Sequence, residues 1–221
     1  MMTQTELQTR LAEAFLAEQE GELLDALKAY RDIYVASPHD QDAIVGLART
    51  ALALGEVEYA FDFFVKLLIE NHQHPWGYWG RAAVYFTYHQ RERAYREVCR
   101  ALALDVPATS LHVDCAVLLN ENGYYEEALQ ALSALDETDF DEDAEIEWCY
   151  AEIMLGNVRE KTRSLLQRHG HRAENLSIWK LLDAMSFYHV DRNKSLAVIR
   201  EVLREEPELQ YRVEALGIEE A

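Results

Sequence analysis

The sequence feature that most constrains the fold is a motif that recurs every 34 residues. The motif is clearest at Asn122–Leu135. Two series of alanines and one series of turn residues recur at this spacing. The first alanine series is Ala26, Ala60, Ala94 and Ala128, the second is Ala14, Ala48, Ala82 and Ala116, and the turn positions are Gly21, Gly55, His89 and Gly123. Repetition at a fixed distance of this size indicates supersecondary units that are stacked one on the next.

One unit consists of two predicted helices separated by a glycine. Apolar residues cluster between Leu111 and Leu119 before Gly123, and they recur at helical spacing from Tyr125 to Leu135 after it. Glycine adopts the left-handed backbone conformation that ends a helix without a steric penalty, so we expect Gly123 between the two helices. The small side chains of the alanine series would let the paired helices approach closely.

These units resemble the tetratricopeptide repeat, a helix–turn–helix unit of the same length. The resemblance is carried by Gly21-Glu22-Leu23-Leu24-Asp25-Ala26, by Gly55-Glu56-Val57-Glu58-Tyr59-Ala60 and by Gly123-Tyr124-Tyr125-Glu126-Glu127-Ala128. A fifth unit places Asn157 in the glycine position, and a sixth, which contains Trp179 and Pro207, is shifted by one residue. The resemblance implies an all-α fold, namely a right-handed superhelical solenoid of about six repeats.

The predicted repeats account for nearly the whole chain. Their approximate boundaries are 7–40, 41–74, 75–108, 109–142, 143–175 and 176–208, and residues 209–221 are predicted to form a capping helix. The 221 residues include only four prolines and nine glycines, which leaves no stretch that reads as a flexible linker. We therefore expect one domain, 1–221, built as a single solenoid.

The charge of the chain favours basic partners and argues against nucleic acid. It has 40 acidic and 21 basic residues and a net charge of −19, whereas binding to phosphates depends on lysine and arginine. Basic segments of a protein partner are expected instead. No run approaches the roughly 18 apolar residues of a membrane span, and the chain does not open with a signal-peptide pattern. The cysteines at 99, 115 and 149 are predicted to be reduced and buried, so we expect a cytoplasmic location.

No motif predicts catalysis, a cofactor or a bound metal. The sequence has no HExxH, no glycine-rich phosphate loop and no Gly-x-Ser-x-Gly. Two pairs of histidines, His72 with His74 and His169 with His171, fall at predicted repeat junctions, where polar loop residues are expected. The acidic run 136–147 lacks the glycine of a calcium loop, and we interpret it as a loop that leads into a helix with an acidic first turn. The protein is therefore predicted not to be an enzyme.

The segment 74–88 departs from a purely structural unit because it contains two tryptophans, three tyrosines and a phenylalanine. In the family that the chain resembles, the first helix of each pair lines the inner, concave surface. The resemblance implies that this surface consists of Leu11, Phe15, Asp42, Val45, Arg49, Trp76, Trp79, Ala83, Phe86, Val113, Val117 and Asn120. Trp76, Trp79 and Phe86 share one face of a helix, which fits either a filled core or, with Arg49, a binding hot spot.

A basic clamp for a C-terminal carboxylate, the best-known ligand mode of the family, is not predicted. The inner positions that it would use carry Leu11, Phe15, Val45 and Trp79, with Arg49 as the lone cation. The leading hypothesis is an adaptor or scaffold whose concave groove binds a peptide segment, extended or helical, through apolar and aromatic anchors. Two alternatives stay open: a secretion-type or assembly chaperone that holds an apolar client, and a non-catalytic subunit or scaffold of an enzyme complex. Homo-oligomerisation is also open.

Replacing Gly55 with valine tests the predicted turns. A branched side chain forced into left-handed geometry should lower the free energy of unfolding by about 1–2 kcal/mol. Thermal or denaturant unfolding measures this change, and unchanged melting would contradict the turn assignment.

Overall fold

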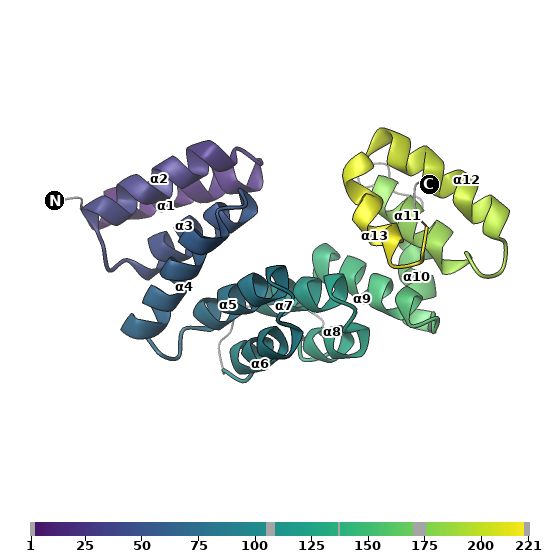
Figure 1. Cartoon of the computed structure of the whole chain (residues 1–221). Helices are drawn as coiled ribbons and strands as arrows, with labels where there is room; N and C mark the ends of the chain where they lie inside the picture. Colours follow the sequence, from purple (N-terminus) through teal and green to yellow (C-terminus); the bar gives the residue numbers. More distant parts are fainter. Residues whose placement is uncertain (1–2, 105–108, 137, 170–175, 219–221) are drawn as a thin grey trace. The chain divides into compact units, whose positions relative to one another are not determined.

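The computed structural model describes residues 3–104, 109–136, 138–169 and 176–218, and within these ranges it contains helices and no strands (Figure 1). The chain divides into two compact units, Met1–Pro107 and Ala108–Ala221, which we call unit 1 and unit 2. The predicted all-α, helical-repeat architecture is thereby confirmed. A single continuous solenoid over residues 1–221 stays a prediction.

Unit 1 consists of three helix pairs. They are α1 (Gln4–Gln19) with α2 (Leu23–Ala36), α3 (Gln41–Ala53) with α4 (Val57–Glu70), and α5 (Pro75–Thr87) with α6 (Arg91–Leu102). Each helix packs against the next one along the chain, and α3 also contacts both α1 and α5. The first helices of the three pairs therefore form one layer of unit 1, which is the layer that the resemblance assigns to the inner surface.

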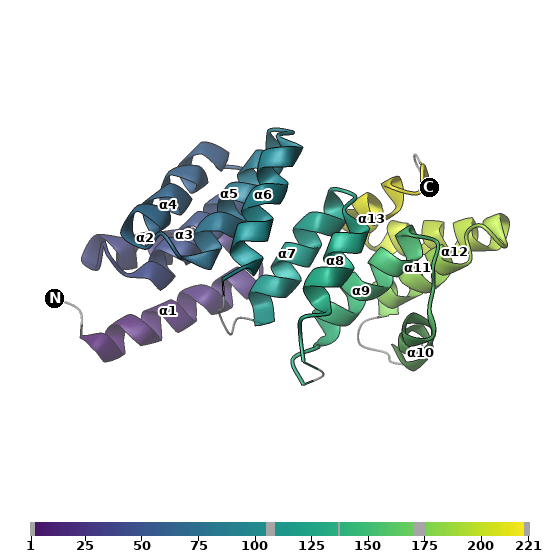
Figure 2. The ribbon, with the colours of Figure 1, turned by 90° about the horizontal axis from the view of Figure 1, so that it is seen from below.

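Unit 2 begins with α7 (Thr109–Glu121), and α8 (Tyr125–Leu132) packs against both α7 and α9 (Glu142–Met154) (Figure 2). The helices that follow are α10 (Glu160–His169), α11 (Leu176–Ser186) and α12 (Arg192–Glu205). The segment predicted as a capping helix is a 3-10 turn, Pro207–Leu209, followed by the short helix α13 (Gln210–Glu214). Val213 and Ile218 of this segment are buried in the core that α9, α11 and α12 also build.

The predicted turn residues adopt the left-handed conformation that ends a helix. The four positions have φ between 57° and 80°, and His89 is the one that is not glycine. After α1, the amide of Gly21 donates to the carbonyl of Glu18, and the amide of Glu22 donates to the carbonyl of Ala17 at 2.9 Å. The same pair of bonds recurs at the other turns, so each helix end satisfies its last carbonyls in the same way.

The prediction for the fifth turn is wrong by one residue. Gly156 has a φ of 65°, and its amide donates to the carbonyl of Ile153, while Asn157 is the residue that follows the left-handed position. The glycine lies one residue before the 34-residue register. Because it accepts a positive φ without strain, the turn is made there and α9 ends one residue earlier than the repeat requires.

The alanine series marks the places where helices approach one another. All eight of its members are at most 1% exposed: Ala14, Ala26, Ala48, Ala60, Ala82, Ala94, Ala116 and Ala128. Two glycines extend this pattern in unit 1. A Cβ atom on Gly46 would lie 2.2 Å from Cε1 of Tyr30, and one on Gly80 would lie 2.1 Å from Cδ1 of Phe64. Each aromatic ring therefore lies directly on the backbone of the next helix.

The cysteines only partly match the expectation of burial. Cys115 and Cys149 are buried, but Cys99 on α6 is exposed, because it falls on the face of α6 opposite to the buried Ala94, Val98 and Ala101. Burial raises the pKa of the Cys149 thiol to about 12. Cys149 is therefore protonated at neutral pH.

The contact between Gly80 and Phe64 can be tested with a double-mutant cycle. Overpacking of a well-packed core typically costs about 1–3 kcal/mol. Gly80→Ala should therefore lower the free energy of unfolding by this much more in the parent, which has Phe64, than in the Phe64→Leu variant. Equilibrium unfolding of the parent, Gly80→Ala, Phe64→Leu and the double variant gives the coupling free energy. Strict additivity of the two changes would show that the ring does not lie on the Gly80 backbone.

Candidate functional site

The predicted inner surface of unit 1 contains a cluster of side chains from all three first helices. We call it the Arg49 cluster, and it consists of Glu18, Tyr30, Arg49, Trp76 and Trp79. Glu18 comes from α1, Arg49 from α3 and the tryptophans from α5, while Tyr30 reaches the cluster from α2. The layer of first helices thus brings together residues that are far apart in the sequence.

The Arg49 guanidinium lies over two tryptophan rings. Its central carbon is 4.9 Å from the ring centroid of Trp76 and 5.7 Å from that of Trp79. The two rings are 5.6 Å apart and meet nearly edge to face, with an interplanar angle of 72°. Cation–π attraction and edge-to-face packing both stabilise this arrangement. The two tryptophan rings therefore hold the guanidinium of Arg49 in place.

Glu18 forms an ion pair with the same guanidinium group. Its Oε1 atom lies 3.3 Å from Nε of Arg49, and its Oε2 atom accepts a hydrogen bond of 3.0 Å from the Tyr30 hydroxyl. Burial and the neighbouring carboxylate raise the pKa of Tyr30 above its usual value. The phenol therefore remains a hydrogen-bond donor at physiological pH, and Glu18 is held by α2 and α3 together.

Trp79 belongs to both the surface and the core. Its ring packs at 6.1 Å against Phe64 of the buried core of unit 1, and the structure gives its enclosed Nε1 atom no hydrogen-bond partner. Nearby, His74 precedes α5, and burial lowers its pKa although Asp42 opposes the shift. Burial therefore favours the neutral form of the His74 imidazole at physiological pH.

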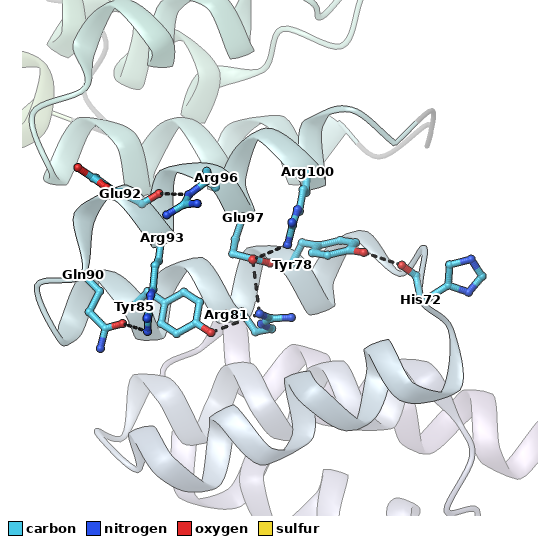
Figure 3. Close-up of polar contacts among 10 residues, drawn as sticks. All are labelled: His72, Tyr78, Arg81, Tyr85, Gln90, Glu92, Arg93, Arg96, Glu97 and Arg100. Atoms are coloured by element: carbon cyan, nitrogen blue, oxygen red, sulfur yellow. Dashed lines mark hydrogen bonds and ion pairs between the residues drawn. The ribbon is translucent and has the colours of Figure 1, made fainter.

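The opposite side of α5 is joined to α6 by polar contacts (Figure 3). The buried carboxylate of Glu97 lies 3.4 Å from Nη2 of Arg81 and 2.8 Å from Nη1 of Arg100. Arg81 also reaches the hydroxyl of Tyr85, whose ring packs against Phe61 of α4. Tyr85 therefore lies between helices, and these contacts fix the helix that carries Trp76 and Trp79.

The residues predicted to form the inner surface of unit 1 differ in exposure. Phe15 is 54% exposed, and Leu11, Val45, Arg49, Trp76 and Trp79 are partly buried. Ala83 and Phe86 are each only 6% exposed, so they offer little surface to a ligand. The structure brings Arg49, Trp76 and Trp79 into contact, and it places Leu11 and Val45 against the two small cores beneath them.

In unit 2, the predicted inner residues are mostly covered. Val113 and Asn120 are buried, and Val117 is partly buried. The amide nitrogen of Asn120 donates to Oε2 of Glu147 at 2.8 Å, and Glu147 forms an ion pair with Arg212 of α13. The C-terminal segment of the same chain is thus linked through Glu147 to the predicted inner residue Asn120.

The sequence interpretation missed Glu18, Tyr30, Glu147 and Arg212. Glu18 lies three residues after Phe15 and seven after Leu11, so helical spacing places it on the same face as these two predicted residues. Glu147 is 34 residues after Val113 and occupies the equivalent position in the next repeat. The register that identified the apolar inner positions could thus have identified both carboxylates. Nothing in the sequence indicated that Arg212 would reach Glu147.

The histidine pairs have structural neighbours of their own. His74 lies directly before α5, and His169 stacks on Trp179 with its Nε2 atom 2.6 Å from Oε2 of Glu145. His171 lies outside the described residues. Within the described ranges, no group of three metal-ligating side chains occurs, and no helix is both long and apolar enough to cross a membrane.

Comparison with known proteins identifies the fold. No protein-family model matches the sequence, and no curated protein matches it. Similar solved structures include a tetratricopeptide repeat protein from Parabacteroides merdae, with a TM-score of 0.61 and 16% identity over 97% of this chain and 84% of that chain. YrrB, a TPR protein with an unusual peptide-binding site, has a TM-score of 0.54 and 16% identity over 87% of this chain and 100% of that chain.

A third similar structure is a chain of the APC/C hetero-tetramer Cut9–Hcn1, with a TM-score of 0.69 and 13% identity. The match covers 96% of this chain but only 42% of that one, so this chain spans less than half of its length. Identities this low establish the fold alone. The chain has the tetratricopeptide repeat fold that its sequence predicted.

Removing the Glu18 carboxylate tests the geometry of the Arg49 cluster. Glu18→Ala leaves the Tyr30 hydroxyl without its acceptor and Arg49 without its Glu18 ion pair, so unfolding should become easier by about 1–3 kcal/mol. Glu13→Ala, at an exposed position of the same helix, is the matched control and should stay within about 0.5 kcal/mol of the parent. Equal stability of the two variants would contradict the anchoring role of Glu18.

Proposed function

We propose that the protein is an interaction module, an adaptor or scaffold, and that the inner surface of unit 1 binds a peptide segment of a partner protein. The observation that carries this proposal is the Arg49 guanidinium fixed over Trp76 and Trp79. Binding hot spots are enriched in tryptophan and arginine. Partly exposed, rigid aromatic rings lose little conformational entropy when a ligand covers them, which favours affinity.

The fold supports the same proposal. YrrB is described as a TPR protein with an unusual peptide-binding site, and another similar chain is part of the hetero-tetramer Cut9–Hcn1. By analogy, the layer of α1, α3 and α5 is the surface on which a peptide would lie in this chain.

The chemistry of the surface favours an apolar segment with basic flanks. Phe15, Trp76 and Trp79 supply apolar contact area, and the chain carries a net charge of −19. Such a charge steers basic segments towards the protein and repels acidic ones. The apolar contacts should therefore hold the peptide, whereas the charge should mainly raise its association rate at low salt.

A second candidate function, a chaperone that holds an apolar client, is favoured by exposed apolar side chains on the first helix pair. Leu16 on α1 and Leu24 and Val35 on α2 are all exposed. Exposed apolar side chains offer contact area to the apolar residues of an unfolded client. Suppression of the aggregation of an unrelated, chemically denatured protein would support this candidate, and selective binding of one peptide class would favour the adaptor.

Peptide selection tests the proposed binding surface. Peptides of 12–16 residues are selected from a display library on the parent protein, and their affinities for Trp76→Ala are measured by fluorescence polarisation. Loss of a central aromatic anchor costs about 2 kcal/mol or more, so Kd should rise about 30-fold or more. Arg49→Ala should weaken the same peptides.

Tyr88→Ala is the matched control for this experiment, because Tyr88 is an exposed aromatic residue directly after α5 and outside the predicted inner surface. It should leave the affinity unchanged. Circular dichroism confirms that each variant is folded. If the selected peptides bind folded Trp76→Ala as tightly as they bind the parent, the proposed surface is wrong.

A further inference from the structure

The C-terminal segment places an arginine in a buried carboxylate site of unit 2. Arg212 of α13 is 7% exposed, and Glu147 of α9 is 3% exposed. Nη1 of Arg212 is 3.1 Å from Oε2 of Glu147, and Nη2 is 2.5 Å from Oε1. Two parallel hydrogen bonds between a guanidinium and a carboxylate form the pairing that distinguishes arginine from lysine.

The rest of this site also fits a guanidinium. The Tyr150 ring of α9 lies 4.8 Å from the central carbon of Arg212, and the Tyr211 hydroxyl accepts a hydrogen bond of 2.8 Å from its Nε atom. Asn120 of α7 donates to Oε2 of Glu147 at 2.8 Å. The site thus offers a carboxylate and an aromatic face, whereas the Tyr211 hydroxyl belongs to the C-terminal segment itself. The predicted inner residue Asn120 contacts the carboxylate from α7.

Residues 207–218, which we call the resident segment, leave one buried polar atom of this site without a hydrogen bond. Oδ1 of Asn120 is buried, and the structure gives it no hydrogen-bond partner. An unpaired buried acceptor is unfavourable, and a peptide with one further donor beside its arginine would satisfy it. The site is therefore built for an arginine-bearing segment, but it is not fully matched by residues 207–218.

Capping of the solenoid does not by itself explain the ion pair. A terminal repeat needs only apolar side chains to cover its core, and Val213 and Ile218 supply them in unit 2. A buried ion pair stabilises a fold less than apolar packing of the same volume, but it makes the site selective for the matching charge. The pair between Arg212 and Glu147 therefore indicates a site that prefers a guanidinium.

We propose that the inner face of unit 2 around Glu147 binds an arginine-bearing helical segment of a partner protein, and that residues 207–218 occupy this site until the partner displaces them. In the free chain, the segment lowers the apparent affinity for the partner by the fraction of molecules in which the site is open. The proposal concerns unit 2 alone and does not require peptide binding by unit 1.

A peptide competition experiment on the full chain tests this proposal. The probe is a fluorescein-labelled synthetic peptide with the sequence of residues 206–218, and the control peptide has alanine at the position of Arg212. Full-length Arg212→Ala should bind the probe at least tenfold more tightly than the parent does, because its own segment has lost the contact with Glu147. The control peptide should bind at least tenfold more weakly than the probe.

Two further variants separate recognition from folding. Arg212→Lys keeps a positive charge beside Glu147 but loses the paired hydrogen bonds, so its affinity for the probe should lie between those of the parent and Arg212→Ala. Adding Glu147→Gln to Arg212→Ala should remove at least tenfold of the probe affinity. Equal affinities of the parent, Arg212→Lys and Arg212→Ala would overturn the proposal.

Hydrogen exchange on the parent chain covers the case in which Arg212→Ala does not fold. With excess unlabelled probe, amides in residues 210–218 should exchange faster because the resident segment has been displaced. Unchanged exchange would show that the segment is a permanent cap and would overturn the proposal. Trp76→Ala should behave like the parent here, so a failure at unit 1 can be distinguished from a failure at unit 2.

Discussion

The structure depends on the close approach of helices at small residues. The buried alanines and Gly46 and Gly80 leave room for neighbouring helices, and aromatic rings fill the space directly on the glycine backbones. This packing sets α1, α3 and α5 side by side in unit 1. Only then can Glu18 reach Arg49, and Arg49 reach the tryptophans of α5. The candidate site is thus a consequence of the same small residues that produce the repeat.

The left-handed turn is the second constraint. Its position depends on which residue accepts a positive φ as well as on the 34-residue spacing. His89 adopts a φ of 57° at a position where the other repeats use glycine or place one close by. In the fifth repeat the register predicted Asn157, but the turn forms at Gly156. A residue without a Cβ atom accepts the conformation more easily than asparagine does. The repeat length therefore changes by one residue to match the available glycine.

The sequence predicted most of the fold but only part of the site. Regular alanines and glycines determine helix pairing, so the first four turns and the buried alanine series followed from spacing alone. Exposure did not, since Phe86 shares a helix face with Trp76 and Trp79 but is buried. Glu18 and Glu147 were also missed: spacing places both at inner positions, but the interpretation followed apolar residues and left the carboxylates out. The contact between Arg212 and Glu147 joins residues that are 65 positions apart. It depends on how the C-terminal segment folds back onto α9, which the spacing of residues does not predict.

Site-specific photo-crosslinking tests the central claim that the layer of α1, α3 and α5 is the binding surface. A benzoylphenylalanine replaces Phe15, which is exposed on the predicted inner surface, or Leu24, which is exposed on α2. A peptide selected on the parent should become crosslinked at position 15, and excess unlabelled peptide should prevent this. Crosslinking at position 24 but not at position 15 would show that the layer of α1, α3 and α5 is not the binding surface.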